Sequence, residues 1–114
     1  MASAKQEWLV IFPDHEGALK KRLEVRPKHI EAIVADGGKG FWLMGGALLE
    51  RPLDGTEAPP PSVGSAMLCA ANSKEEVLDR LKADLYTTAG VWDWNKIQIY
   101  PFKCAVRTAM DEVK

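Results

Sequence analysis

The order of two kinds of apolar pattern most strongly limits which fold this chain can adopt. Four short runs rich in β-branched and aromatic residues alternate with two stretches of helical spacing, in the order strand, helix, strand, strand, helix, strand. This order is typical of the ferredoxin-like βαββαβ fold, an α+β architecture. It predicts a four-stranded antiparallel sheet with both helices on one face. Because 114 residues is an ordinary domain length, we expect residues 1–114 to form a single domain.

The predicted strands are short apolar runs bounded by residues that end them. They cover residues 8–12, 41–49, 64–71 and 92–102. The third scarcely alternates between polar and apolar residues, so we expect it to be buried on both faces. Between the second and third strands, the proline-rich stretch predicts a surface loop, which is either a lid or binding loop or a plain extended excursion.

The first predicted helix starts near Glu16, and its apolar side chains are spaced to fall on one face that packs on the core. Pro27 lacks an amide hydrogen, which predicts a kinked or two-part helix. The glycines between Asp36 and Gly40 are expected to close it. The apolar positions are Leu19, Leu23, Ile30, Ile33 and Val34.

The second helix is predicted to start at a capping box, in which the Ser73 hydroxyl accepts from the Glu76 amide. Because both helices are predicted on one face of the sheet, the other face is left uncovered. The chain is rich in aromatic residues that could lie on that open face. A second copy packed sheet to sheet would cover it, so we expect a homodimer. The aromatic residues in question are Trp8, Phe41, Trp42, Trp94, Tyr100 and Phe102.

Charge and cysteine content exclude several classes of protein. Fifteen Lys and Arg residues against sixteen Asp and Glu give a net charge of −1, so we expect no nucleic-acid partner. No apolar run is long enough for a signal peptide or a membrane span, which predicts a cytoplasmic protein without a membrane partner. Cys69 and Cys104 form neither a disulfide framework nor a metal-binding pair, and we interpret both as thiols.

Few residues are candidates for chemistry, because the sequence has no G-x-S-x-G, P-loop or H-E-x-x-H motif. His15 lies in a polar turn and is interpreted as solvated. His29 is either a half-buried histidine hydrogen-bonded at a helix start or a general acid or base. Asp84 is its best candidate partner, since a carboxylate at a helix C-terminus is disfavoured by the helix dipole and so suggests another role.

Several short segments match one known family in order and spacing. They are residues 10–12, Arg22, 26–30, 45–47, 64–65, 84–86, 89–91 and 101–103. On these segments the chain resembles the YciI-like (YCII-related) proteins, small dimeric α+β domains similar in fold to muconolactone isomerase. The resemblance implies an active site built on a His-Asp pair, here His29 and Asp84. The family usually has Gly-Pro where this chain has Gly45-Gly46, and Asp-Pro-Tyr where it has Asp84-Leu85-Tyr86.

Five further residues are candidate substrate contacts. Ser65 is interpreted as a hydrogen-bond donor or a turn hydroxyl, and Arg22 and Arg26 as groups that orient a carboxylate or phenolate or as solvated helix arginines. Tyr86 and Trp92 either wall the pocket or serve packing.

Two functions remain open at this point. The first is a lyase, dehydratase, isomerase or cyclase that uses no metal or nucleotide cofactor and acts on a small cyclic or unsaturated organic acid or phenol. The second is a non-catalytic dimeric module that binds a small molecule in the same cleft.

Overall fold

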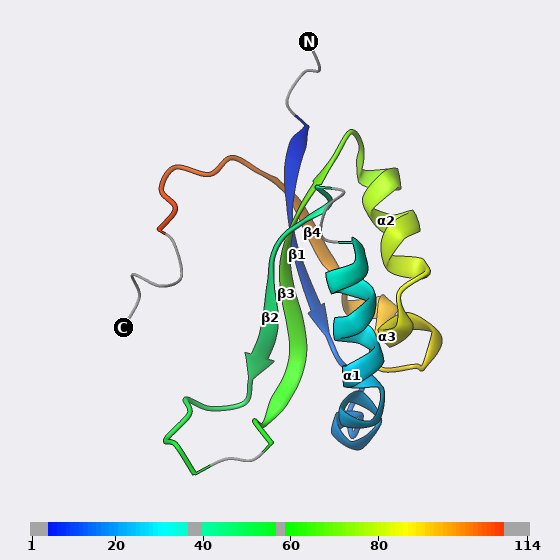
Figure 1. Cartoon of the computed structure of the whole chain (residues 1–114), viewed down its shortest axis with the longest axis vertical. Coiled ribbons are helices and arrows are strands. Elements are labelled where there is room, and N and C mark those ends of the chain that lie inside the picture. Colours follow the sequence, from blue (N-terminus) through cyan, green and yellow to red (C-terminus); the bar gives the residue numbers. More distant parts are fainter. Residues whose placement is uncertain (1–4, 37–39, 57–58, 109–114) are drawn as a thin grey trace.

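A computed structural model describes residues 5–36, 40–56 and 59–108 and has the predicted fold (Figure 1). Four strands form one antiparallel sheet in the order β2-β3-β1-β4, so the predicted ferredoxin-like α+β class is confirmed. The elements are β1 (Gln6–Pro13), α1 (Leu19–Asp36), β2 (Trp42–Leu49), β3 (Ser62–Ala71), α2 (Lys74–Lys82), α3 (Leu85–Thr88), the 3-10 helix η2 (Trp94–Lys96) and β4 (Gln98–Phe102).

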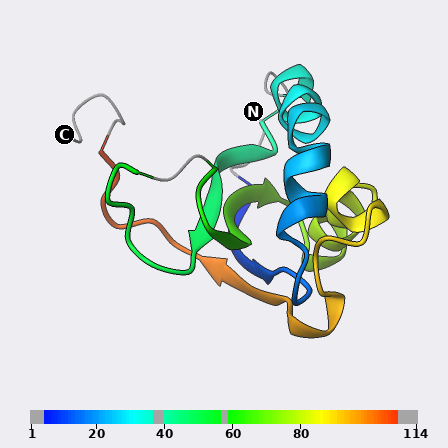
Figure 2. The ribbon, with the colours of Figure 1, turned by 90° about the horizontal axis from the view of Figure 1, so that it is seen from below.

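The core lies between the sheet and the helices, all of which cover one face (Figure 2). Strand register decides which side chains enter it, because residues paired across antiparallel strands point to the same side of a sheet. Val10 pairs with Met67 and Phe12 with Ser65, and these four side chains face the helices. The predicted burial of the third strand is found in most residues of β3, which lies between β2 and β1 in the sheet.

The last strand is shorter than predicted, since β4 begins at Gln98 and not at residue 92. Asp93 accepts a hydrogen bond from the Asn95 amide and caps η2, which interrupts the extended chain. Trp92 instead forms an isolated bridge with Asp14. This short connection holds Trp92 beside the start of α1, where the site is built.

Helix α1 is one helix that contains Pro27, so of the two predicted forms the two-part helix is wrong. The helix changes direction along its length, in agreement with the predicted kink (Figure 1). Pro27 lies on the exposed side of the helix, where water can hydrogen bond to the carbonyl that the missing amide leaves free. The helix ends at Asp36; of the glycines predicted to close it, Gly37 and Gly38 lie outside the described residues. Gly40 has a φ of 76°, a left-handed conformation that suits glycine.

The predicted core-facing stripe of α1 is wrong. The buried residues of this helix are Arg22 and His29, whereas Ile30 and Val34 are 40% and 73% exposed. The reason is that α1 packs mainly against α3 and leaves a cavity between itself and the sheet. Its polar side chains therefore point inward, and part of its apolar stripe lines the cavity.

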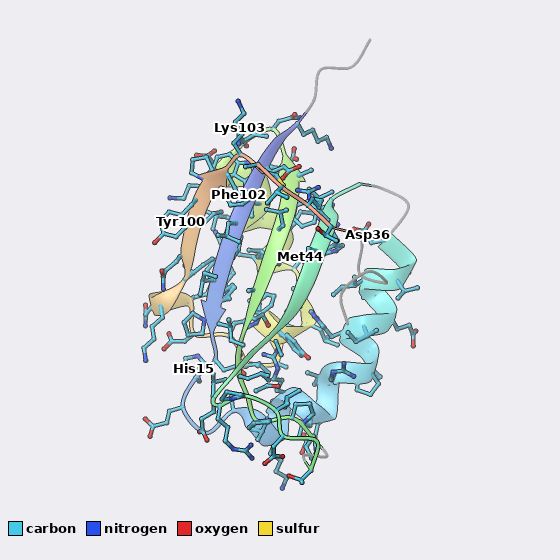
Figure 3. The ribbon with its side chains drawn as sticks, turned by 90° about the vertical axis from the view of Figure 1, so that its left-hand side faces the viewer. His15, Asp36, Met44, Tyr100, Phe102 and Lys103 are labelled. Carbon is cyan, nitrogen blue, oxygen red and sulfur yellow. The ribbon has the colours of Figure 1, made fainter. Side chains whose placement is uncertain are left out.

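The open face of the sheet carries fewer aromatic side chains than predicted. Phe41 is buried in the core, Trp8 packs against the core, Trp42 lines the cavity, and Trp94 packs edge-on against Phe12. Tyr100 and Phe102 do lie on the open face, where Figure 3 shows them with Met44. Within the ranges listed above, no helix is long and apolar enough to cross a membrane.

The two thiols differ in their surroundings, and this gives a stability prediction. Cys69 is fully buried, and burial raises the pKa of its thiol from 9.0 to about 12, against the opposing effect of the Arg80 charge. In the unfolded chain this thiol ionises near pH 9. Its contribution to the free energy of unfolding is therefore fully present below pH 9 and is lost as pH rises toward 12. That difference corresponds to about 4 kcal/mol.

Cys69→Ala is therefore expected to flatten the alkaline part of the stability curve, measured by denaturant unfolding at a series of pH values. Cys104→Ala is the matched control, since Cys104 is partly exposed and should leave the slope unchanged. The same alkaline slope in Cys69→Ala and in wild type would contradict the assignment.

Candidate active site

The cavity between α1 and the sheet has a volume of about 450 Å³, within the usual size range of small-molecule pockets. It brings together side chains from α1, β3, α3 and the connection that follows α3. Six of the seven predicted site residues line it, and the seventh, Asp84, is hydrogen bonded to one of them. These six are Arg22, Arg26, His29, Ser65, Tyr86 and Trp92.

His29 and Asp84 form a hydrogen-bonded pair at the inner wall of the cavity. His29 Nδ1 lies 2.9 Å from Asp84 Oδ1, and both side chains are largely buried. The same carboxylate oxygen accepts the Tyr86 backbone amide, also at 2.9 Å. Because a carboxylate only accepts hydrogen bonds, Nδ1 carries the proton in the neutral ring. His29 Nε2 has no hydrogen-bond partner among the described residues.

Asp84 is not the C-terminal residue of α2 that the sequence suggested. The α2 helix is capped by Ala83, and Asp84 then adopts an extended conformation as the N-cap of the short helix α3. A carboxylate is favoured at a helix N-terminus, where it accepts free backbone amides. The break between α2 and α3 therefore places the Asp84 carboxylate at a fixed point facing α1.

Aromatic rings hold the imidazole of His29 in place. The ring stacks on Tyr86 with centroids 3.8 Å apart and meets Trp92 edge-on at 6.1 Å. Burial raises the pKa of the Tyr86 phenol, while the charges of Arg22 and Arg26 act in the opposite direction. Tyr86 is thus a neutral wall of the site near neutral pH.

Arg22 belongs to a buried network that the sequence did not indicate. Its Nη1 donates to both carboxylate oxygens of Asp14, at 2.9 and 3.1 Å, and its Nη2 donates to Ser65 Oγ at 2.9 Å. The guanidinium also lies over the Tyr86 ring at 4.7 Å. Burial raises the pKa of the Asp14 carboxyl, and Arg22 opposes that rise. Asp14 follows a strand-ending proline, so its position in the sequence predicted only a turn.

Ser65 accepts two hydrogen bonds, because the Trp92 indole N–H also donates to its Oγ at 3.1 Å. Both donors lack any lone pair with which to accept. The hydroxyl hydrogen of Ser65 therefore finds no acceptor among the described residues and is available to a ligand in the cavity. Two N–H donors on the oxygen, one of them cationic, make this hydroxyl a stronger donor.

Arg26 lies one turn beyond Arg22 on the same helix, at the exposed side of the cavity. It has no ion-pair partner within the described part of the chain. The same part contains no group of three or more His, Cys, Asp or Glu side chains placed to hold a metal ion.

A family model for the YCII-related domain matches residues 7–103, which is most of the chain and includes every site residue described above. The chain belongs to the YCII-related domain family. This YCII-related protein is 34% identical to Aspercryptin biosynthesis cluster protein B of Emericella nidulans, over 92% of its own length and 67% of that relative. It is also 34% identical to Fusaric acid biosynthesis protein 2 of Gibberella moniliformis, over 90% of its own length and 98% of that relative.

A solved structure with the same fold is 5-chloro-2-hydroxyhydroquinone dehydrochlorinase from Burkholderia phenoliruptrix, in complex with 2,5-dihydroxybenzoquinone. The TM-score is 0.73 at 23% sequence identity, and the match covers 87% of this chain and 95% of that one. At this identity the likeness establishes the fold of the YCII-related protein.

Proposed function

We propose that this YCII-related protein is an acid/base enzyme that transfers a proton on a small cyclic or unsaturated organic acid or phenol, and that needs no metal or nucleotide cofactor. The observation that carries the proposal is the hydrogen bond between His29 Nδ1 and Asp84 Oδ1 at the cavity wall. It leaves Nε2 as the nitrogen that a bound substrate can reach. Imidazole suits this role because it gains and loses a proton near neutral pH.

The proton transfer follows from the contacts around His29. Nε2 takes a proton from a substrate carbon or hydroxyl, and Asp84 stabilises the imidazolium that forms. The electron pair moves to a substrate oxygen, which accepts the free hydroxyl hydrogen of Ser65. Arg26 supplies a positive charge for an anionic substituent. Return of the proton to another atom gives an isomer, and departure of a leaving group gives an elimination or dehydration.

The names of related proteins support this class of chemistry. The fungal relatives are named for biosynthesis clusters of small molecules, and the dehydrochlorinase is named for removing the elements of hydrogen chloride from a hydroxylated ring. Loss of a proton and a leaving group from such a ring needs a base and a site for a developing oxyanion. The cavity lining offers a candidate for each role: His29, which stacks on Tyr86, and Ser65, which is hydrogen bonded to Trp92.

The test uses deuterium exchange, which detects proton transfer before the natural substrate is known. The protein is incubated in D₂O with 2,5-dihydroxybenzoquinone or cyclohexane-1,3-dione, and loss of the exchangeable C–H signals is followed by proton NMR. Binding is measured in parallel by quenching of tryptophan fluorescence. Exchange faster than the buffer rate supports the proposal. Binding without faster exchange would overturn it in favour of the non-catalytic module.

We further propose that two copies pack through the open faces of their sheets. Leu9 and Leu68 are paired at the centre of that face; Leu68 is already buried within the chain, whereas Tyr100 beside them is half exposed. The expected mass in sedimentation equilibrium is about twice the chain mass of 12.6 kDa. Leu9→Glu places a charge in the interface and should give single chains; a single-chain mass for wild type would contradict the dimer.

A further inference from the structure

The cavity has two halves of different chemistry. The inner half carries the polar groups of Arg22, His29 and Ser65. The other half is formed mainly by apolar side chains, and the exposed Arg26 lies between two of them on α1. We call this half the apolar arm. Its lining residues are Leu23, Ile30 and Ile33 of α1, Trp42 and Gly45 of β2, and Pro59 and Pro60 of the loop between β2 and β3.

The cavity is too large for a single ring. A cavity of roughly 150 Å³ accepts one benzene molecule, whereas this one has about 450 Å³. A ring whose reacting atoms lie beside His29 would leave the apolar arm unfilled. Ile30 and Ile33 of α1 line the arm and are not part of the hydrophobic core. Ile30 is 40% exposed to solvent when the cavity holds no ligand. Contact with an apolar group would remove these side chains from water.

Gly45 keeps the arm open. It pairs in register with Met67, a core residue on the helix side of the sheet, so a side chain at this position would project toward α1. A Cβ built on Gly45 meets no atom within 4 Å, which means that the space above it is empty. Gly46 pairs with Ala66, so a side chain at this position would project to the opposite side of the sheet, although the glycine itself also lines the cavity. A Cβ on Gly46 is equally free of contacts.

We propose that the apolar arm binds a hydrophobic substituent carried by the reacting ring, and that Gly45 is the residue that sets how long this substituent can be. The inference rests on the proposed function for the position of the ring. The substrate class is thereby narrowed to an ionisable ring with an alkyl or alkenyl chain. The chain lies between α1 and β2, and the ring oxygens lie near Ser65 and His29.

The test measures affinity for two ligand series by isothermal titration calorimetry. The first is 2,5-dihydroxybenzoquinone with hydrogen, methyl, propyl or pentyl at one ring carbon. The second is the matching series of 4-alkylphenols, whose binding does not require the site to recognise a quinone. Each methylene that enters the arm should tighten binding roughly fourfold in wild type. Gly45→Val should abolish this gain with chain length, and Gly46→Val should retain it.

A second pair of variants guards against misfolding at Gly45. Ile33→Ser replaces a side chain that lines the arm and should reduce the gain, whereas Val34→Ser changes its exposed neighbour and should not. A gain in either series that Gly45→Val removes supports the proposal. Affinity independent of chain length in both series, or equal effects of the Gly45 and Gly46 variants, would overturn it. His29→Gln should keep the gain, so the arm is judged separately from catalysis.

Discussion

His29→Gln is expected to lower the rate of enzyme-catalysed deuterium exchange by about 10²–10⁴-fold, the usual contribution of a general acid or base. Glutamine has a similar size and can still donate a hydrogen bond to Asp84 Oδ1, so the N-cap of α3 should persist, while the ring stack on Tyr86 is lost. What the variant loses is a group that takes up and returns a proton. The affinity for 2,5-dihydroxybenzoquinone should change far less than the exchange rate.

His15→Gln is the matched control, because the chain has a second histidine outside this cavity. His15 is half exposed, and its Nδ1 lies 3.8 Å from Asp93 Oδ2, which is too long for a hydrogen bond. This variant should exchange deuterium at the wild-type rate. Equal rates in His29→Gln and wild type would remove His29 from the mechanism, whereas equal losses in both histidine variants would point to a general effect on the fold.

The His29–Asp84 contact was predictable because the fold brings the two residues together. The βαββαβ order places both helical segments on one face of the sheet, so residues 55 positions apart in the chain lie side by side. The physical reason given for Asp84 was nevertheless wrong. Sequence patterns did not show that α2 stops at Lys82, and only the break before α3 explains why a carboxylate is favoured there.

The orientation of α1 was not predictable from its apolar spacing. Hydrophobic periodicity assumes that the apolar side of a helix meets the core, whereas α1 faces a cavity and buries Arg22 and His29. Burial of an arginine requires a counter-charge, and Asp14 supplies it from the end of β1. Nothing in the sequence around Asp14 shows that the bridge between Asp14 and Trp92 holds it beside α1.

The second large effect is expected from Arg22→Leu, which should lower the free energy of unfolding at neutral pH by about 3–5 kcal/mol. The side chains of Arg22 and Asp14 are only 6% and 4% exposed, so the variant leaves a buried carboxylate without its counter-charge. Urea unfolding followed by tryptophan fluorescence measures the change. Arg26→Leu makes the same substitution one turn along α1, where the side chain is exposed, and should cost no more than about 0.5 kcal/mol.

The pH dependence separates this charge effect from lost packing. Burial already raises the pKa of Asp14 above 3.8, and removal of Arg22 should raise it further. A raised carboxyl pKa favours the folded state at low pH, and this advantage is lost as pH rises. The loss in free energy of unfolding caused by Arg22→Leu, relative to wild type, is the deficit; it should therefore shrink as pH falls toward 4. Adding Asp14→Asn to this variant should recover part of the deficit at neutral pH. A deficit that stays constant with pH and is unaffected by Asp14→Asn would mean that Arg22 acts through packing alone.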